Sequence, residues 1–492
     1  MKLDDLLSFT RRKGLVWQSA ELYGGMAGFY DYGHLGAGLK RRWEDLWLDY
    51  FLGLHDNYHL IDSANVMPEE SLKASGHVAH FTDILVECQK CHASYRADTL
   101  IEEKTGKSAE DLTTEETDRR IAETGLKCAK CGGAFSKSSP FNMMFPLQVG
   151  ARQDEHGYLR PETAQGVYLN FNREFELLRK RLPMGLAIIG RAYRNEIAPR
   201  QVLYRLRELI QAELQIFFDP EKFDREVNTG QVDDYELNVS LVEERDMRVM
   251  RTVRASELYS RLPPWYVYHM AKIQEFYIDG MKVPAQKFRF REKSEKERAF
   301  YNRIHFDIEV ELESLGGFRE VAGIHYRGDY DLTCHQKGSA KSLEVNIEGK
   351  KFIPHVLELS FGVDRNVWAL LDLHYSKQGE RTLFSIPSRL APVQVGVFPL
   401  MARDGLDSAA AEIAKTLRAA GLRVFYDESG SIGRRYARMD ESGTPFCVTV
   451  DYDSLEKKDA TIRERDSARQ VRVPIPDLAS RLGALLCGKE VL

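Results

Sequence analysis

The stretch "GRAYRNEIAPRQVLYRLRELIQAELQIFF", from Gly190 to Phe218, decides the fold, because it combines a strand-like pattern with five arginines and three glutamates. Successive side chains of a β-strand point to opposite faces. Even positions of the returning segment carry Ile210, Ala212, Leu214 and Ile216, whereas odd positions carry Arg205, Arg207, Leu209, Gln211, Glu213 and Gln215. In the first segment, Arg194 and Glu196 share a face. The pattern predicts a hairpin with one apolar, packed face and one charged face.

The charged face has two explanations. On its own it is typical of a solvent-facing edge hairpin. Three other apolar segments, however, carry polar groups in the same way: "YLRPETAQGVYLNF" (158–171), "EVAGIHYRGDYDL" (320–332) and "PHVLELSFGVDRNVWALL" (354–371). Structural ion pairs would explain any one of them, since buried charges need partners or a charged ligand. Four together indicate a ligand of both signs, such as an amino acid with a nucleoside triphosphate.

The composition is that of a globular protein of 492 residues, with 43% hydrophobic residues, a net charge of −5 and a pI near 6.3. This length exceeds one ordinary core, so two or three domains are expected. The charge excludes a polycation but not a local basic face for nucleic acid. No segment approaches the ~18 apolar residues of a membrane span, and the N-terminus lacks a signal-peptide core. We therefore expect a cytoplasmic protein without membrane association.

Four of the seven cysteines form two CxxC pairs, Cys88 with Cys91 and Cys128 with Cys131. Two such pairs brought together supply the four thiolates of a tetrahedral zinc site. The 36 residues between the pairs exceed the usual zinc-ribbon spacing, but they have the character of a helical excursion. The alternative is four free thiols, because disulfides are disfavoured in a reducing compartment. The pattern predicts a structural Zn²⁺, since four thiolates leave no open coordination position.

The order of strand-like and helix-like segments differs between the two parts of the chain. Strand-like runs between about residues 184 and 361 are separated by helices and loops, which favours a mainly antiparallel sheet over regular βαβ units. From Ala391 onward, strands and helices alternate, as in a compact α/β domain. The segment "FSIPSRLAP" (384–392), with two prolines, is the expected linker.

Several motifs resemble those of class II aminoacyl-tRNA synthetases, and in particular of the homodimeric glycyl-tRNA synthetase family. "RNE" (194–196) is similar to the second signature motif of the class, and "GVDR" (362–365) is similar to the third. Further segments resemble the glycyl family: "YDYGHLGAGLKRRWED" (30–45), "SGHVAHFTD" (75–83), "LRPETAQGVYLNF" (159–171), "AGIHYRGDYDL" (322–332) and "DESGSIGRRYARMDESGTPFCVTVDYDSLE" (427–456). The resemblance covers nearly the whole chain, with the motifs in the same order.

The resemblance implies a reaction and a domain plan. Glycine and ATP would form glycyl-adenylate and pyrophosphate, and the glycyl group would pass to the 3' end of tRNA(Gly). Residues 1–385 would form an α+β catalytic domain on a mainly antiparallel sheet of six to seven strands, with flanking helices. A cysteine-paired insert at 86–135 and a helical insertion at 220–300 would interrupt it. Residues 386–492 would form a smaller α/β anticodon-binding domain, and 40–68 would form the interface of a homodimer.

The resemblance assigns ATP and Mg²⁺ to one set of residues. Arg194 would hold the α-phosphate, Glu196 the adenine edge and Arg365 the γ-phosphate, and these three are the expected catalytic residues. The other ATP-contacting residues would be Asn195, Tyr204, Arg205, Leu206, Arg207, Glu208, Leu209, Glu320, Val321, Gly362, Val363 and Asp364. Glu320 and the backbone near Val321 would help to hold Mg²⁺, which needs only one or two carboxylates beside phosphate oxygens. A planar guanidinium suits phosphate because it binds two oxygens at once.

The glycine pocket must bind an ammonium group and exclude larger side chains. The resemblance assigns it to Arg96, Glu162, Leu209, Gln211, Glu213, Arg327, Glu358, Leu359, Ser360, Phe361 and Gly362. The carboxylates and Ser360 would hold the ammonium, and Arg327 would face the carboxylate. A filled pocket rejects added methyl groups by overlap, so no editing domain is expected. Three positions depart from the family: Leu209 replaces a phenylalanine that stacks on adenine, Leu359 replaces a proline, and Ala322 replaces a glutamate of some members.

Arginines concentrate near the C-terminus, at Arg434, Arg435, Arg438, Arg463, Arg465, Arg469 and Arg472. They form either a solvated basic surface or, as the resemblance implies, contacts to tRNA phosphates, with Phe425 or Tyr426 stacking on unpaired bases. Two other functions stay open. A synthetase for threonine, proline, serine or histidine would lack the acidic-pocket motifs. A non-catalytic protein on the same scaffold would be expected to lose the ATP-binding charges, which are all present here.

Overall fold

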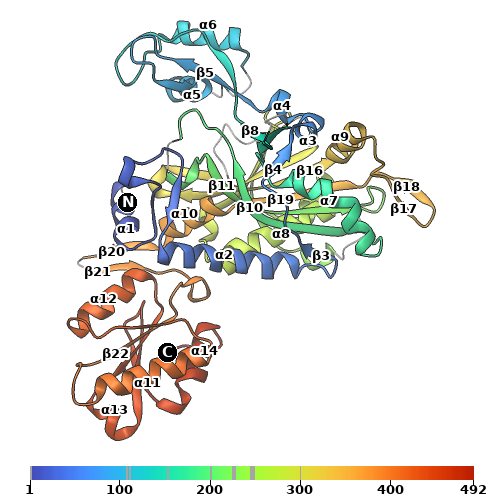
Figure 1. The fold of residues 1–492 in the computed structure, drawn as a ribbon. Coiled ribbons are helices and arrows are strands. Elements are labelled where there is room, and N and C mark those ends of the chain that lie inside the picture. Colours follow the sequence, from blue (N-terminus) through green and yellow to red (C-terminus); the bar gives the residue numbers. More distant parts are fainter. Residues whose placement is uncertain are drawn as a thin grey trace.

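The computed structural model describes residues 3–492 except for 107–108, 110–111, 152–154, 200–201, 224–228, 244–249, 300 and 380. A central body carries a small insert on one side and a separate C-terminal domain on the other (Figure 1). Within the described residues, no helix combines the length and the apolar character needed to cross a bilayer.

A nine-stranded sheet forms the centre of the body, in the order β13-β12-β14-β15-β16-β19-β11-β10-β3. The strands are β3 (Tyr58–Leu60), β10 (Met184–Tyr193), β11 (Glu208–Phe218), β12 (Glu236–Ser240), β13 (Arg251–Arg254), β14 (Phe288–Glu292), β15 (Ile304–Leu312), β16 (Gly317–Gly328) and β19 (His355–Gly362). Neighbouring strands are antiparallel except in the pairs β3–β10 and β12–β14. The mainly antiparallel sheet is confirmed, and the hairpin that decides the fold supplies β10 and β11.

The sheet is larger than six or seven strands because the segment 220–300 contributes β12, β13 and β14. The same segment contains helix α8 (Pro264–Glu275), which continues as a π-helical turn (Phe276–Gly280). In β14, Phe288 and Phe290 are fully buried while Arg289 and Arg291 are half-buried. This two-residue period extends over only five residues, which makes it a weak strand signal. The segment is therefore mixed rather than purely helical.

Three helices cover one face of the sheet: α2 (His34–Leu52), α8 and α10 (Val363–His374). The even-numbered residues of β11, Ala212, Leu214 and Ile216, are fully buried in this core, as the alternation predicts. Trp43 and Trp47 of α2 pack on Phe361 of β19, with ring centroids 6.5 and 5.8 Å apart. Burial of such large rings fixes α2 across the sheet.

Helices α7 (Ala164–Leu177) and α9 (Tyr330–Ser339) lie on the other face. Tyr168 of α7 packs edge-on against Phe217 of β11, with ring centroids 6.2 Å apart. The odd-numbered Gln211, Glu213 and Gln215 are consequently buried. The charged face of the hairpin is not a solvated edge, and its polar groups must be satisfied inside the protein or by a ligand.

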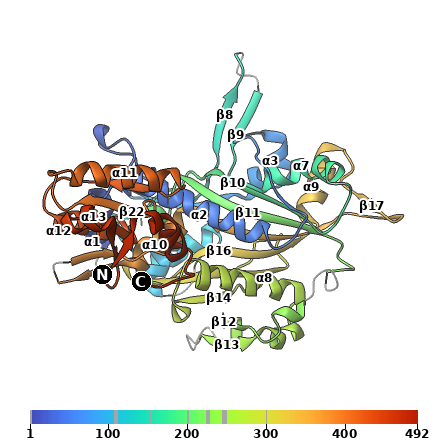
Figure 2. The ribbon, with the colours of Figure 1, turned by 90° about the horizontal axis from the view of Figure 1, so that it is seen from below.

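Smaller elements surround the body. The insert contains a three-stranded sheet of β5 (Thr82–Glu87), β6 (Ser94–Arg96) and β7 (Ser139–Asn142), with helices α5 (Ala97–Thr105) and α6 (Thr114–Thr124). A second sheet joins β4 (Val66–Pro68), β8 (Phe145–Val149) and β9 (Glu155–Leu159), and the β8–β9 hairpin projects from the body (Figure 2). The other elements are α1 (Leu3–Arg12), β1 (Val16–Gln18), β2 (Tyr30–Tyr32), α3 (Glu69–Ala74), α4 (His77–His80), β17 (Val345–Ile347), β18 (Lys350–Phe352), β20 (Tyr375–Gln378) and β21 (Arg381–Phe384).

The C-terminal domain has its own five-stranded sheet, in the order β23-β22-β24-β25-β26. Its elements are β22 (Val395–Pro399), α11 (Leu406–Ala419), β23 (Val424–Tyr426), α12 (Ile432–Ser442), β24 (Phe446–Val450), α13 (Tyr452–Lys457), β25 (Asp459–Glu464), β26 (Gln470–Pro474) and α14 (Leu478–Leu486). A separate apolar core, with Val397, Leu417 and Val448 among its members, holds these elements together. The strands β23, β22 and β24 are parallel, as expected of an α/β domain.

Three of the arginines expected on the basic surface of this domain are buried instead: Arg435, Arg463 and Arg465. Arg463 donates to both oxygens of Asp440, at 2.9 and 3.1 Å. Arg465 donates to the carbonyl oxygens of Gly443 and Ile386, at 2.9 and 3.1 Å. Their donors satisfy oxygens inside the fold, so these arginines are structural and do not belong to an exposed basic face.

The Asp440 carboxylate also accepts a hydrogen bond of 2.9 Å from Arg381 of β21. This contact joins the C-terminal domain to the body. Asp440→Ala would leave Arg463 buried without its carboxylate. We expect the free energy of unfolding to fall by about 3–5 kcal/mol, measured by urea unfolding. The control is Asp453→Ala, because Asp453 forms an exposed ion pair with Lys457 and should cost no more than ~1 kcal/mol. Equal costs for the two variants would contradict this assignment.

Candidate active site

A cleft lies where the β10–β11 hairpin, the start of α10 and the insert meet. It is lined by Arg96, Met143, Arg194, Glu196, Leu203, Tyr204, Arg205, Leu206, Leu209, Ile210, Gly362, Asp364 and Arg365. Most residues that the resemblance assigns to ATP are thus brought together. Leu206 and Leu209 give the cleft apolar surface suited to the flat face of a base, and its arginines suit phosphate.

Arg194 is held by its Nε and keeps its outer nitrogens available. Nε donates to the carbonyl oxygen of Pro161 at 3.1 Å, and the guanidinium lies 5.5 Å from the ring centre of Phe81. Its backbone N–H donates to the carbonyl of Arg207, which closes the hairpin. Among the described residues, the Nη atoms of Arg194 have no acceptor, so the forked end of the side chain is free to bind an anion.

Glu196 is buried at the same cleft, with 9% of its surface exposed. Its Oε2 has no hydrogen-bond partner among the described residues. Among the described residues the nearest cation is Arg205, whose Nε lies 4.0 Å away, beyond hydrogen-bond distance. A buried carboxylate oxygen without a donor is costly, and it marks a place where a ligand donor fits.

Arg365 lies in the first turn of helix α10 and faces Glu320 at the rim of the cleft. Its Nη1 lies 2.8 Å from Glu320 Oε1, and its Nε donates to the carbonyl oxygen of Tyr204 at 3.3 Å. Asp364 fixes the start of the helix, because its carboxylate accepts from the Ile210 N–H and the Tyr32 hydroxyl, both at 2.6 Å. Burial nevertheless raises the pKa of Asp364 to about 6.

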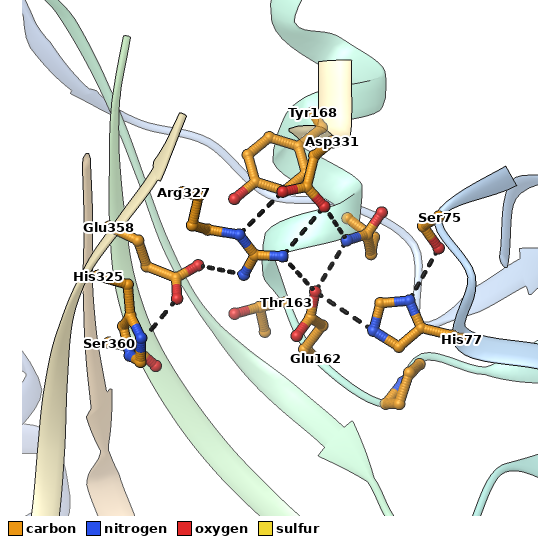
Figure 3. A network of polar contacts seen from close by, with 12 residues as sticks. Ser75, His77, Glu162, Thr163, Tyr168, His325, Arg327, Asp331, Glu358 and Ser360 are labelled. Carbon is orange, nitrogen blue, oxygen red and sulfur yellow. Dashed lines mark hydrogen bonds and ion pairs between the residues drawn. The ribbon is translucent and has the colours of Figure 1, made fainter. Parts of the chain in front are cut away.

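Arg327 is the centre of a buried ionic network beside the cleft (Figure 3). Its Nε and Nη2 donate to the two oxygens of Asp331, at 2.9 and 3.0 Å. Its Nη1 donates to Glu358 Oε2 at 2.9 Å. Its Nη2 also lies 3.6 Å from Glu162 Oε1. Each guanidinium nitrogen therefore meets a carboxylate, and three acidic side chains from separate segments are held in place.

Neutral and weakly basic side chains complete this network. Gln165 Nε2 donates to Glu162 at 2.8 Å and to Asp331 at 3.0 Å. His77 contacts Glu162 through Nε2, at 3.5 Å, and Ser75 Oγ through Nδ1, at 2.8 Å. Although burial opposes ionisation, Arg327 and His77 hold the pKa of Glu162 well below its usual range.

Glu213 is a second acidic centre, and it differs from Glu162 in its partners. Its Oε2 accepts from Thr163 Oγ1 at 2.6 Å, and its Oε1 accepts from Ser360 Oγ at 2.8 Å and from Gln211 Nε2 at 3.0 Å. In the part of the chain that the structure describes, no side-chain cation pairs with it. Burial, together with the Glu358 and Glu162 carboxylates, raises the pKa of Glu213 to about 8. A cationic ligand would favour the ionised form of this buried group, which has only neutral donors around it.

Some residues assigned by the resemblance lie elsewhere. Leu359 and Phe361 are fully buried in the core on the α2 side, because strand alternation turns them away from Glu358 and Ser360. Their side chains therefore do not form the glycine pocket.

Besides Glu320 at the rim, five residues of the ATP set lie outside the cleft lining. Val321 and Val363 belong to the core, and the N–H of Asn195 donates to the Met143 carbonyl. Glu208 pairs with Arg191 at 2.6 Å. Arg207 donates to the carbonyls of Glu196 and Ala27, at 3.0 and 3.2 Å, so it braces the loop that carries Glu196.

The structure adds site residues that the sequence did not single out. Asp331 lies four residues after Arg327, at the start of α9, and this i, i+4 acidic–basic spacing was the available signal. Thr163 and His325 gave none, because one hydroxyl and one imidazole in apolar surroundings are usually structural. His77 contacts Glu162 from a separate segment, and no local pattern in the sequence indicates this contact.

The two cysteine pairs converge in the insert. Cys88 Sγ lies 3.4 Å from Cys131 Sγ, and Cys91 Sγ lies 3.6 Å from Cys128 Sγ. All four sulfur atoms lie within 4.8 Å of one another. Thiolates at a Zn–S distance of about 2.3 Å from a tetrahedral centre would be about 3.8 Å apart, so the group fits one metal ion.

Comparisons with known proteins show which class of protein shares this architecture. Residues 147–374 match the tRNA synthetase class II core domain (G, H, P, S and T), and residues 394–485 match an anticodon binding domain. Prolyl-tRNA synthetase from Cryptosporidium parvum, complexed with L-proline and AMP, has the same fold with a TM-score of 0.59 at 15% identity. The similarity covers 98% of this chain and 75% of that chain. The fold and the cleft thus define a class II tRNA synthetase.

Curated relatives specify the family within this class. Glycine–tRNA ligase of Thermococcus gammatolerans is 37% identical over 99% of this chain and 99% of that protein. The enzyme of that name from Pyrococcus horikoshii is 37% identical, again over 99% of each chain. The one from Methanothermobacter thermautotrophicus is 36% identical over 97% of this chain and 98% of that protein. This chain belongs to the glycine–tRNA ligase family.

The buried proton on Glu213 gives a stability prediction. The ordinary value of 4.5 applies in the unfolded chain, so between about pH 5 and 8 the folded protein holds a proton that the unfolded chain releases. By linkage, this group makes the free energy of unfolding fall as pH rises through that range. Glu213→Gln removes the effect, so the Tm of the variant relative to the wild type should increase from pH 6 to pH 8 in a thermal-shift assay.

Glu176→Gln, at an exposed position, controls for the loss of a carboxylate as such. A Tm difference between Glu213→Gln and the wild type that stays constant over this pH range would refute the assignment.

Proposed function

We propose that this protein is a glycine–tRNA ligase, which activates glycine with ATP to glycyl-adenylate and pyrophosphate and then transfers glycine to the 3' end of tRNA(Gly). The observation that carries the proposal is the adjacency of the acidic pocket around Glu213 and the arginine-lined cleft. Ser360 of the pocket and Gly362 of the cleft lie two residues apart on one face of β19, about 7 Å along the strand. This spacing suits a ligand whose ammonium and phosphoryl groups are joined through one carboxylate.

The chemistry needs positioning more than proton transfer. In the first step, a carboxylate oxygen of glycine bonds to the α-phosphorus, and the bond from that phosphorus to pyrophosphate breaks. The carboxylate is already ionised near pH 7, so no general base is required. In the second step, a ribose hydroxyl of the tRNA attacks the glycyl carbonyl carbon and loses its proton, and AMP leaves. Alignment and neutralisation of phosphate charge are therefore the main tasks of the site.

The geometry supports a role for each cleft residue. Arg194 binds the α-phosphate through its free Nη atoms. Glu196 accepts a hydrogen bond from the adenine amino group at its unpartnered Oε2. Arg365 binds the γ-phosphate in place of its contact with Glu320. Glu320, exposed at the rim, would hold Mg²⁺ with the triphosphate, and the ion would supply further positive charge there.

Glu213 and Ser360 receive the glycine ammonium, with Glu162 and Glu358 nearby. The resemblance implies that Arg327 contacts the glycine carboxylate directly, whereas here we propose an indirect role for it. Because every nitrogen of Arg327 already meets a carboxylate, the residue acts by fixing Glu162 and Glu358 in place. Leu209 and Gly362 line the ATP cleft and are also assigned to glycine by the resemblance, so the two substrates would meet beside them.

The tRNA would be held by the C-terminal domain, residues 386–492. Its buried arginines are excluded from this role, but Arg434, Arg469 and the 44% exposed Phe425 remain accessible for phosphates and bases. We also propose a homodimer formed through residues 40–68, where the 51% exposed Leu60 supports an apolar contact. A tRNA-charging enzyme acts where proteins are made, which agrees with a cytoplasmic location.

The four convergent cysteines would hold a structural Zn²⁺. The insert that they stabilise also supplies Arg96, which lines the cleft and pairs with Asp83 at 3.0 Å. Zinc bound there would therefore support the nucleotide site indirectly, through the position of β6.

The activation step is tested by Arg194→Ala. Loss of a phosphate-binding guanidinium should lower the rate of glycine-dependent ATP–pyrophosphate exchange by about 10²–10³-fold. Arg173→Ala, on the exposed surface of α7, is the control for removal of a positive charge and should leave exchange within a fewfold of the wild type. Full exchange by Arg194→Ala would overturn the proposed mechanism, and wild-type exchange that does not depend on glycine would overturn the proposed function.

The metal assignment is tested by Cys88→Ser. We expect about one zinc per chain in the wild type by plasma mass spectrometry, and a loss of most of it in the variant. The KM for ATP should rise as Arg96 loses its support. Cys487→Ser, which removes an exposed thiol, should keep its zinc. Wild-type protein purified without any bound metal would disprove the assignment.

A further inference from the structure

The glycine pocket lies on a row of residues across three strands. Ser360 of β19 is opposite Glu213 of β11 on one side and opposite Gly323 of β16 on the other. Glu213 and Ser360 are joined by a hydrogen bond of 2.8 Å, but Gly323 brings no side chain to the third place in the row. A substrate ammonium between Glu213 and Ser360 would have this third place as its neighbour, so what fills it decides how much room the substrate has.

The ring of His325 fills this place. His325 lies two residues further along β16, opposite Glu358, and its side chain leans back over Gly323. A Cβ at Gly323 would lie 2.4 Å from His325 Nε2 and 3.0 Å from its Cε1, and the third-nearest atom would be its Cδ2, at 3.4 Å. The imidazole thus occupies the volume that a side chain at Gly323 would need, next to Ser360.

Three contacts hold the ring in this position. The His305 ring packs behind it, tilted by 41° with centroids 4.1 Å apart, and Asn302 Nδ2 lies 3.2 Å from His325 Nδ1. On the other edge, Nε2 lies 3.7 Å from Glu358 Oε1. The side chain keeps 15% of its surface exposed, so an edge of the ring still faces open space. A ring fixed from both sides acts as a rigid wall, because packed interiors yield little to an added methyl group.

The charge state of the ring agrees with this role. Burial, with His305 and Arg327 nearby, lowers the pKa of His325 well below its ordinary value. A neutral imidazole does not repel an ammonium group held by Glu213. A cationic side chain at the same place would do so.

We propose that His325 is a specificity-determining residue, whose ring occupies the space over Gly323 and beside Ser360 that the side chain of a larger amino acid would need. The inference rests on the proposed function and adds the means by which glycine is separated from alanine and serine. A purely structural role for His325 would leave that separation unchanged, because truncation would then alter stability and not substrate choice.

The test is ATP–pyrophosphate exchange with glycine and with alanine, for the wild type and for His325→Ala in the full-length protein. The ratio of kcat/KM for alanine to that for glycine should rise about tenfold or more in the variant. This is the discrimination that one added methyl group typically produces in a tight pocket. The control is His269→Ala, which truncates a fully buried histidine of α8 and should keep the wild-type ratio. An unchanged ratio in a His325→Ala protein that still activates glycine would overturn the inference, whereas wild-type protein inactive with glycine would overturn the proposed function instead.

A second pair of variants, compared as folded proteins, tests the same contact from the side of Gly323. Gly323→Ala places a methyl group against the ring, so glycine activation should fall. The double variant Gly323→Ala/His325→Ala should recover activity, because removal of the ring makes room for the methyl group. A double variant no more active than Gly323→Ala would contradict a steric wall at His325.

Discussion

The interaction on which the site depends is that of one buried guanidinium with three carboxylates. Arg327 contacts Asp331, Glu358 and Glu162, which belong to α9, β19 and the segment before α7. Each of these charges would be costly to bury alone, and their mutual attraction offsets the loss of hydration only in a well-ordered geometry. The network therefore fastens the covering helices to the sheet and fixes the acidic groups of the pocket at the same time.

Glu162 and Glu213 show how environment divides the work between two carboxylates in one pocket. Glu162 has a guanidinium and an imidazole beside it and stays ionised. Glu213 has only hydroxyl and amide donors, so the protein does not compensate its charge, and burial raises its pKa to about 8. An ammonium ligand would supply the missing charge. A pocket of this kind is less stable without such a ligand, which is the usual relation between stability and function at a binding site.

The sequence was sufficient for features that depend on local period and motif. The alternation at 210–216 predicted which face of β11 carries apolar side chains into the main core, and the short motifs around Arg194 and Arg365 indicated residues that line the cleft. It was insufficient where position depends on distant segments. The buried Arg435 and Arg463 look like surface charges in the sequence, because their partners lie on other elements. Likewise, the relation of His325 to Gly323 and Ser360 requires the register of two strand pairs.

Arg96 links two parts of the molecule that look independent in Figure 1. It belongs to β6 of the cysteine-bearing insert, yet it lines the nucleotide cleft and is anchored by Asp83 and Asp98. Whatever orders the insert also orders one wall of the cleft. Because coupling of binding free energies is reciprocal, a ligand that contacts Arg96 in the cleft and an ion held by the four cysteines would each stabilise the site of the other. A single side chain would then connect the two sites.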